Sequence, residues 1–103
     1  MKFIEVITTF DSVAEARKMA KAIIEKRLGG CCSIQGIESY YRWDGKIEIS
    51  SECQLTIKTA ENLYSKLEGF ILKSHTYDTP QIISLPILNG SDKYIKWLEG
   101  EIK

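Results

Sequence analysis

Apolar side chains change their spacing along this chain, and each change marks a new element. Residues 3–10 form a run rich in β-branched and aromatic side chains, which predicts a strand. Ser12 and Glu15 have the spacing of a capping box, so we expect a helix to begin there. Apolar residues then recur at helical spacing until Gly29-Gly30, a typical helix end.

A β-hairpin is predicted by Asp44-Gly45, which separates two strand-like runs over residues 31–43 and 46–59. This dipeptide favours a type I′ turn, because both central residues of that turn need positive φ. On the second run apolar and polar side chains alternate, which predicts one buried face and one solvated face. Gly36 indicates a bulge or bend in the first run.

A second helix and a fourth strand follow the hairpin. We expect Thr59 to cap this helix and a polar loop over residues 75–80 to follow it. Residues 81–88 predict the strand, and Pro86 indicates that this strand either lies at an edge of the sheet or ends there. The apolar stripe of the helix comprises Leu63, Leu67, Phe70 and Ile71.

The predicted order β-α-β-β-α-β-α indicates an α+β fold. Its first six elements match the ferredoxin-like β-α-β-β-α-β arrangement, an antiparallel sheet with two helices on one face. A short C-terminal helix begins after residues 89–91, and we expect Tyr94 and Trp97 to pin it to the body. A chain of this length predicts one domain over residues 1–103.

The predicted hairpin is long for so small a domain. Its second arm, residues 46–59, would extend about 45 Å at ~3.3 Å per residue, whereas a domain of this size has a radius of gyration near ~13 Å. An isolated two-stranded ribbon is only marginally stable and exposes its edges. We therefore predict that it docks on a neighbouring subunit through Tyr41 and Trp43, creating grooves for small ligands or ions. The alternative is a bent hairpin packed on its own domain.

Composition narrows the classes of partner and of chemistry. The 14 basic and 14 acidic residues cancel, which argues against nucleic acid or anionic membranes as partners. No apolar run approaches the ~20 residues of a membrane helix, and no signal peptide is recognisable, so we expect a cytoplasmic protein. Three cysteines without a secretion signal predict reduced thiols. The sequence contains neither a glycine-rich phosphate loop nor a nucleophile elbow, so neither motif points to an enzyme.

Four segments resemble the CutA family of divalent-cation tolerance proteins, in the family's order and spacing. The resemblance implies a ferredoxin-like protomer, a homotrimer built through the long hairpin, binding of divalent metals including copper, and a link to metal tolerance. It also implies a likeness to PII-type signalling proteins, which take effectors in clefts between subunits, and no catalytic reaction. The segments are Glu25-Lys26-Arg27-Leu28-Gly29-Gly30-Cys31, the hairpin tip over residues 41–48, the loop over residues 73–82, and Tyr94-Ile95-Lys96-Trp97-Leu98.

The chain departs from the family pattern in three places. Thr76 stands where the family usually has Pro, so we expect a looser loop around it. Gln81 replaces the usual Glu, which weakens any cation site that used that carboxylate. The first hairpin arm is about one residue short near Gly36.

Cys31 and His75 are the candidate ligands for Cu²⁺ or another divalent metal. If no bulge intervenes, the turn pairs Cys32 with Ile57 and Cys31 with Lys58, so Cys32 faces the core and Cys31 a cleft. Thiolate and imidazole suit copper and zinc, and we expect any site to need residues from two subunits. The structural alternatives are a small buried hydrophobe for the cysteine and a backbone hydrogen bond for the histidine.

The polar residues of the cleft are assigned mainly through the resemblance. It implies that Glu48, Lys58, Tyr77 and Thr79 line a cleft that binds a ligand. Glu48 and Glu52 share one strand face, which is also usual for a solvated surface. The alternative to a metal-binding trimer is therefore a PII-like module that takes a small effector between subunits.

Overall fold

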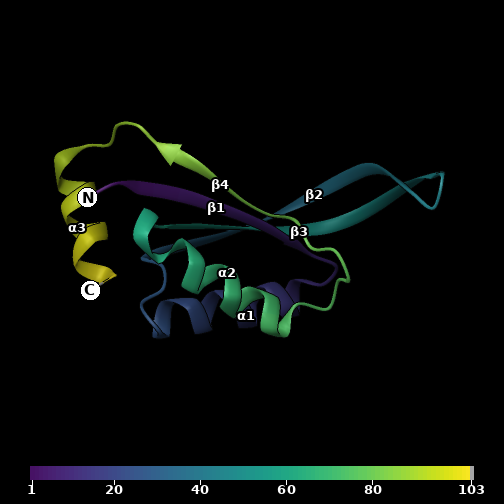
Figure 1. Cartoon of the computed structure of the whole chain (residues 1–103), viewed down its shortest axis with the longest axis horizontal. Helices are drawn as coiled ribbons and strands as arrows, with labels where there is room; N and C mark the ends of the chain where they lie inside the picture. The colour runs from purple at the N-terminus through teal and green to yellow at the C-terminus, as the bar shows by residue number, and fades with distance from the viewer. Residues whose placement is uncertain (103) are drawn as a thin grey trace.

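The computed structural model describes residues 1–102. Its strands form one antiparallel sheet in the order β2-β3-β1-β4, and helices α1 and α2 cover one face of it (Figure 1). This is the predicted ferredoxin-like α+β arrangement. The elements are β1 (Phe3–Phe10), α1 (Val13–Glu25), β2 (Cys31–Trp43), β3 (Lys46–Ala60), the 3₁₀ turn η1 (Glu61–Leu63), α2 (Tyr64–Ser74), β4 (Ile82–Ile87) and α3 (Asp92–Glu101).

The main core lies between the sheet and the helices α1 and α2. Every second residue of β1, such as Val6 and Phe10, faces this core. This pattern is expected because successive side chains of a strand point to opposite faces of the sheet. Leu67 and Ile71 supply the inner face of α2, as expected from their spacing. No helix within residues 1–102 is long and apolar enough to cross a membrane.

A second, smaller cluster holds α3 against the opposite face of the sheet. Leu98 and Ile102 pack there on Phe3 and Ala60, which pair with each other across β1 and β3. Tyr94 is 37% and Trp97 47% exposed, so these two rings pack on the body only in part. Tyr94 also contacts Cys31 of β2, and the ring centroids of Tyr94 and Trp97 lie 5.7 Å apart.

The predicted start of α1 is confirmed, but its predicted end is not. The Ser12 hydroxyl accepts a hydrogen bond from the backbone N–H of Glu15 at 3.2 Å, which confirms the predicted cap. The helix does not end at Gly29-Gly30, since Arg27 already adopts a left-handed φ of 56°. The N–H of Arg27 donates to the carbonyl of Ile24, and that of Leu28 to Ile23, both at 3.1 Å. These two bonds form a Schellman motif.

The start of α2 also differs from the prediction. β3 continues to Ala60, so Thr59 is a buried strand residue and not a helix cap. Its hydroxyl donates to the carbonyl of Leu28 at 2.7 Å, which ties β3 to the end of the α1 connection. α2 begins one 3₁₀ turn later, and its cap residue Leu63 makes no side-chain hydrogen bond.

The hairpin turn has the predicted geometry. Asp44 and Gly45 have φ values of 52° and 75°, both positive as a type I′ turn requires. The register between β2 and β3 is unbroken, and Gly36 pairs directly with Cys53. The predicted bulge at Gly36 is therefore wrong. The expected pairing of Cys31 with Lys58 and of Cys32 with Ile57 is confirmed.

Beyond the sheet, residues 37–52 form a two-stranded extension that we call the ribbon. β1 pairs with β3 only from Cys53 to Ala60, so the ribbon has no third strand beside it. It projects away from the body at the end opposite α3, and the molecule measures 45 × 25 × 22 Å (Figure 1). Ile47 and Ile49 are 70% and 60% exposed. The ribbon does not bend back onto its own domain.

Candidate functional site

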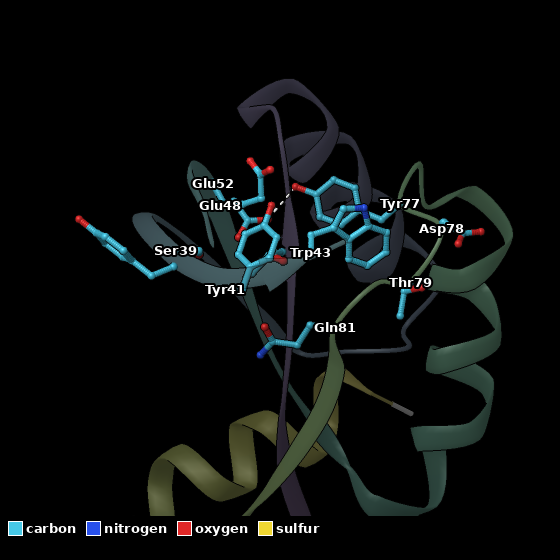
Figure 2. Close-up of a pocket in the computed structure, with 11 residues that line it drawn as sticks. Ser39, Tyr41, Trp43, Glu48, Glu52, Tyr77, Asp78, Thr79 and Gln81 are labelled. Atoms are coloured by element: carbon cyan, nitrogen blue, oxygen red, sulfur yellow. Dashed lines mark hydrogen bonds between the residues drawn. The ribbon is translucent and has the colours of Figure 1, made fainter. Parts of the chain in front are cut away.

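A groove of about 710 Å³ opens where the ribbon leaves the sheet. One wall belongs to the ribbon and the other to the loop between α2 and β4 (Figure 2). Thr9, near the end of β1, also lines the groove. The lining residues are Thr9, Ser39, Tyr40, Tyr41, Trp43, Glu48, Glu52, Tyr77, Asp78, Thr79 and Gln81.

The strand register places the ribbon's share of the lining on one face, except for Tyr40, which pairs with Ile49 on the other face. Tyr41 pairs directly with Glu48, and Trp43 follows Tyr41 two positions along the same strand. Residues two apart on a strand share a face, and directly paired residues have neighbouring side chains. This face is the one opposite α1 and α2, since Cys53 and Leu55, at the alternate positions of β3, pack in the main core.

His75 anchors the loop that forms the other wall. Its Nε2 donates to the carbonyl of Thr9 at 2.8 Å, and its Nδ1 accepts from the backbone N–H of Tyr77 at 3.1 Å. The ring stacks on Phe10 with centroids 4.5 Å apart. These partners require the neutral tautomer that is protonated on Nε2. These are the backbone hydrogen bonds that the structural alternative to a metal ligand predicts for His75.

A second bond holds the same loop against α1. The Thr76 hydroxyl donates to the Glu15 carboxylate at 3.2 Å. Thr76 occupies the position where the resemblance led us to expect a proline and, without it, a looser loop. The hydroxyl supplies a contact that a proline could not make.

Tyr77 joins the two walls of the groove. Its hydroxyl donates to the Glu52 carboxylate at 2.7 Å, across 25 positions of sequence (Figure 2). The pKa of Tyr77 is raised, mainly because the hydroxyl is buried. The hydrogen bond to Glu52 and the negative charge of that carboxylate raise it further. The phenol therefore stays neutral at physiological pH and keeps donating. The bond sets the position of the loop relative to the ribbon.

The electrostatic character of the groove is acidic and aromatic. Glu48, Glu52 and Asp78 contribute carboxylates to its lining, and within residues 1–102 no lysine or arginine lines it. Tyr41, Trp43 and Tyr77 add aromatic rings beside them (Figure 2). Such a lining attracts cations and repels anions.

The groove gathers five of the eight residues that the sequence singled out, and three lie elsewhere. Lys58 does not line it, because it lies farther along β3, opposite Cys31. Glu52 and Asp78 do line it, although the sequence analysis gave them no role. The signal for Glu52 was its place on the same strand face as Glu48. The five residues are Tyr41, Trp43, Glu48, Tyr77 and Thr79.

Cys31 and His75 are not brought together in one chain. Cys31 pairs with Lys58, which is opposite Glu5, whereas His75 contacts Thr9 farther along β1. Cys31 interacts with Tyr94 of α3, and burial and this interaction raise the pKa of Tyr94. In the described part of the chain, no group of three or more His, Cys, Asp or Glu side chains is arranged to hold a metal ion.

The other two cysteines face the core side of the sheet. Cys32 and Cys53 both pack against the main core. Burial raises the pKa of the Cys32 thiol to about 12, with a smaller contribution from Cys31. A thiol that stays protonated is a poor metal ligand. The oxygen ligands of the groove are of the type that hard divalent cations prefer.

Comparison with known proteins identifies relatives of the whole chain. A family model described as CutA1 divalent ion tolerance protein matches residues 4–101. The chain is 40% identical over 101 residues to the chloroplastic protein CutA of Arabidopsis thaliana, covering 97% of this chain and 56% of that protein. It is 38% identical over 94 residues to the divalent-cation tolerance protein CutA of Thermus thermophilus, covering 90% and 91%. The chain thus spans little more than half of its plant relative.

Solved structures match equally well. The crystal structure of CutA1 from Oryza sativa superimposes with a TM-score of 0.96 at 36% identity, covering 100% of this chain and 95% of that one. The structure of the periplasmic divalent cation tolerance protein CutA from Archaeoglobus fulgidus gives a TM-score of 0.95 at 30% identity, covering 98% and 99%. The fold of this chain is therefore that of the CutA structures.

Proposed function

The chain belongs to the CutA1 divalent ion tolerance family, and from this premise we propose that it is a homotrimer that binds a divalent metal of the copper type and serves metal tolerance. The match over residues 4–101 supports one domain across residues 1–103. No catalytic role is proposed. The cytoplasmic location stays a prediction from the sequence.

The observation that carries the proposal is the ribbon with an acidic groove at its base. The ribbon exposes Tyr41, Trp43, Ile47 and Ile49, whose burial against a second copy would remove apolar surface from water. A neighbouring copy seated on Tyr41 and Trp43 would border the groove and turn it into a cleft between subunits. Cyclic assembly of three copies would give every ribbon the same environment.

Two sets of side chains compete for the metal in this assembly. The groove offers Glu48, Glu52 and Asp78, to which a neighbouring copy would add ligands. Cys31 and His75 offer softer donors that suit copper, but they would have to come from different copies. For His75 to ligate through Nδ1, it would also have to release the N–H of Tyr77.

A second candidate function is favoured by the size of the groove. About 710 Å³ lies within the range of roughly 300–1,000 Å³ for small-molecule sites and far exceeds the space of a single ion. The protein would then act as a PII-like module, with an effector bound between subunits at Glu48, Tyr77 and Thr79.

The test is calorimetric titration of the metal-free native chain with Cu²⁺ and with Zn²⁺, together with its mass in solution. We expect a trimeric mass and binding at a fixed ratio of metal to chain. Loss of binding in Glu48→Gln/Glu52→Gln places the metal in the groove, and loss in Cys31→Ser/His75→Ala places it at the softer donors. A native chain that binds neither metal, or that sediments as a monomer, contradicts the proposal.

A further inference from the structure

The connection between β4 and α3 carries a reactive dipeptide, Asn89-Gly90, that does not line the groove. Residues 88–91 belong to no helix or strand, and Asn89 and Gly90 are both exposed. The connection lies at the α3 end of the molecule, opposite the ribbon (Figure 1). Asn-Gly is typical of loops, and asparagine is one of the thermolabile residue types. The connection therefore presents a labile amide to water.

The lability of an Asn-Gly pair comes from the backbone nitrogen of the glycine. This nitrogen attacks Cγ of the asparagine side chain, so that an N–Cγ bond forms and the side-chain amide leaves as ammonia, which also takes the N–H proton. Water then opens the resulting cyclic succinimide at either carbonyl and leaves aspartate or isoaspartate. Glycine favours the attack, because no Cβ hinders it and its backbone is the most flexible.

The structure leaves both reacting groups unrestrained. Among the described residues, neither the side-chain amide of Asn89 nor the backbone N–H of Gly90 makes a hydrogen bond. β4 pairs with β1 only from Ile82 to Ile87, so the sheet ladder does not reach the dipeptide. Ring closure at Asn89 therefore breaks no hydrogen bond of the fold, and only the local backbone has to adjust.

The packing of α3 requires a glycine at position 90. A Cβ added at Gly90 would lie 2.7 Å from Cδ1 and 2.8 Å from Cγ1 of Ile95. Ile95 packs against the second core cluster, so a larger residue at position 90 would have to displace it. The same glycine that lets α3 pack thus keeps Asn89 in its most reactive sequence context.

We infer that Asn89 is a site of spontaneous deamidation, which converts its amide to the carboxylate of aspartate or isoaspartate. The product adds a negative charge to a chain whose formal net charge is zero. This charge arises close to Ser91, the cap residue of α3, where the helix dipole favours an anion. Isoaspartate also lengthens the backbone of the connection, but outside both core clusters. The folded chain therefore tolerates the reaction.

Two other positions of the chain serve as internal comparisons. Asn62 is also exposed, but it lies in η1 and is followed by Leu63, whose side chain hinders attack by the backbone nitrogen. Asp44 is followed by Gly45, but a carboxylate resists a nitrogen nucleophile, and the β2–β3 ladder closes this turn. We expect both positions to react more slowly than Asn89.

The test follows the native chain, at its own oligomeric state, during incubation at physiological temperature and mildly alkaline pH. We expect anion exchange to resolve an acidic form that accumulates with time. It should accumulate more slowly at mildly acidic pH, because the attacking nitrogen has to lose its proton. Peptide mass spectrometry and labelling by an isoaspartyl methyltransferase locate the product. The rate at Asn89 should exceed that at Asn62 by at least roughly tenfold.

Asn89→Gln should stop the acidic form from accumulating, because the longer side chain would have to close a larger ring. Asn62→Gln is the matched control and should behave as the native chain does. Asn89→Asp supplies one product directly and should elute with the acidic form. A native chain that keeps its Asn89 amide under these conditions would overturn the inference, as would an acidic form that accumulates at the native rate in Asn89→Gln. The reaction uses neither metal nor effector, so the result is independent of the proposed function.

Discussion

Two glycines follow α1, and their lack of a side chain allows close contact with the core and with α3. A Cβ added at Gly29 would lie 2.5 Å from Cγ2 of Ile57, and one at Gly30 would lie 2.5 Å from Cδ1 of Leu98. The sequence led us to expect a helix end here, since Gly is common at that position. Arg27 takes that backbone conformation instead, so the glycines serve packing.

Gly29→Ala should therefore destabilise the fold by about 1–3 kcal/mol, because the new methyl group overpacks the contact with Ile57 and Ile23. Urea denaturation measures the difference in the free energy of unfolding. Gly36→Ala is the control, since no atom lies within 4 Å of a Cβ at that strand position. An equal loss of stability in both variants would contradict a packing role for Gly29.

At the scale of elements, the helices α1 and α3 begin alike in sequence but differently in structure. Both have a serine at the cap in an extended conformation. Ser12 accepts a hydrogen bond from Glu15, whereas Ser91 makes no such bond. The cap pattern thus predicts where a helix begins better than it predicts the bond that stabilises that start.

Ser12→Ala should cost about 1 kcal/mol of stability, because the N–H of Glu15 loses its side-chain partner. Ser91→Ala should change stability much less, although the residue type and the cap position are the same. Thermal and urea unfolding of the two variants give the comparison. If Ser91→Ala loses more stability than Ser12→Ala, the hydrogen bond to the cap is not what makes the serine stabilising.

At the scale of the whole molecule, the ribbon is separable from the core. The buried residues of both clusters lie outside residues 37–52. Ser39 pairs with Ser50, so a two-residue turn placed between them preserves the register of β2 and β3. The proposed assembly through the ribbon can therefore be removed without touching the core.

A chain with residues 40–49 replaced by an Asn-Gly turn should fold as a monomer. Its thermal midpoint should not depend on protein concentration, whereas that of the native chain should rise with concentration, since subunit binding stabilises only the folded state. Sedimentation and thermal unfolding over a range of concentrations test both points. If the shortened chain sediments as a trimer, the ribbon is not the main contact between subunits.

The sequence by itself determined the features that depend on near neighbours in the chain. The Asp44-Gly45 turn, the alternation along β3 and the Ser12 cap follow from local backbone preferences and from the periodicity of burial. For Pro86 the sequence left two possibilities, an edge strand or a strand end, and the sheet order shows the edge strand. The register of Cys31 and Cys32 followed as well, because a two-residue turn sets every pair beyond it.

Only the tertiary structure decided which distant side chains meet. The bond between Tyr77 and Glu52, the anchoring of α3 by Leu98, and the separation of Cys31 from His75 depend on how the elements approach one another in space. Local patterns carry no information on those approaches, because any residue of the right polarity satisfies them. For that reason the sequence singled out five of the groove's eleven lining residues, while the contact that shapes the groove came from the fold.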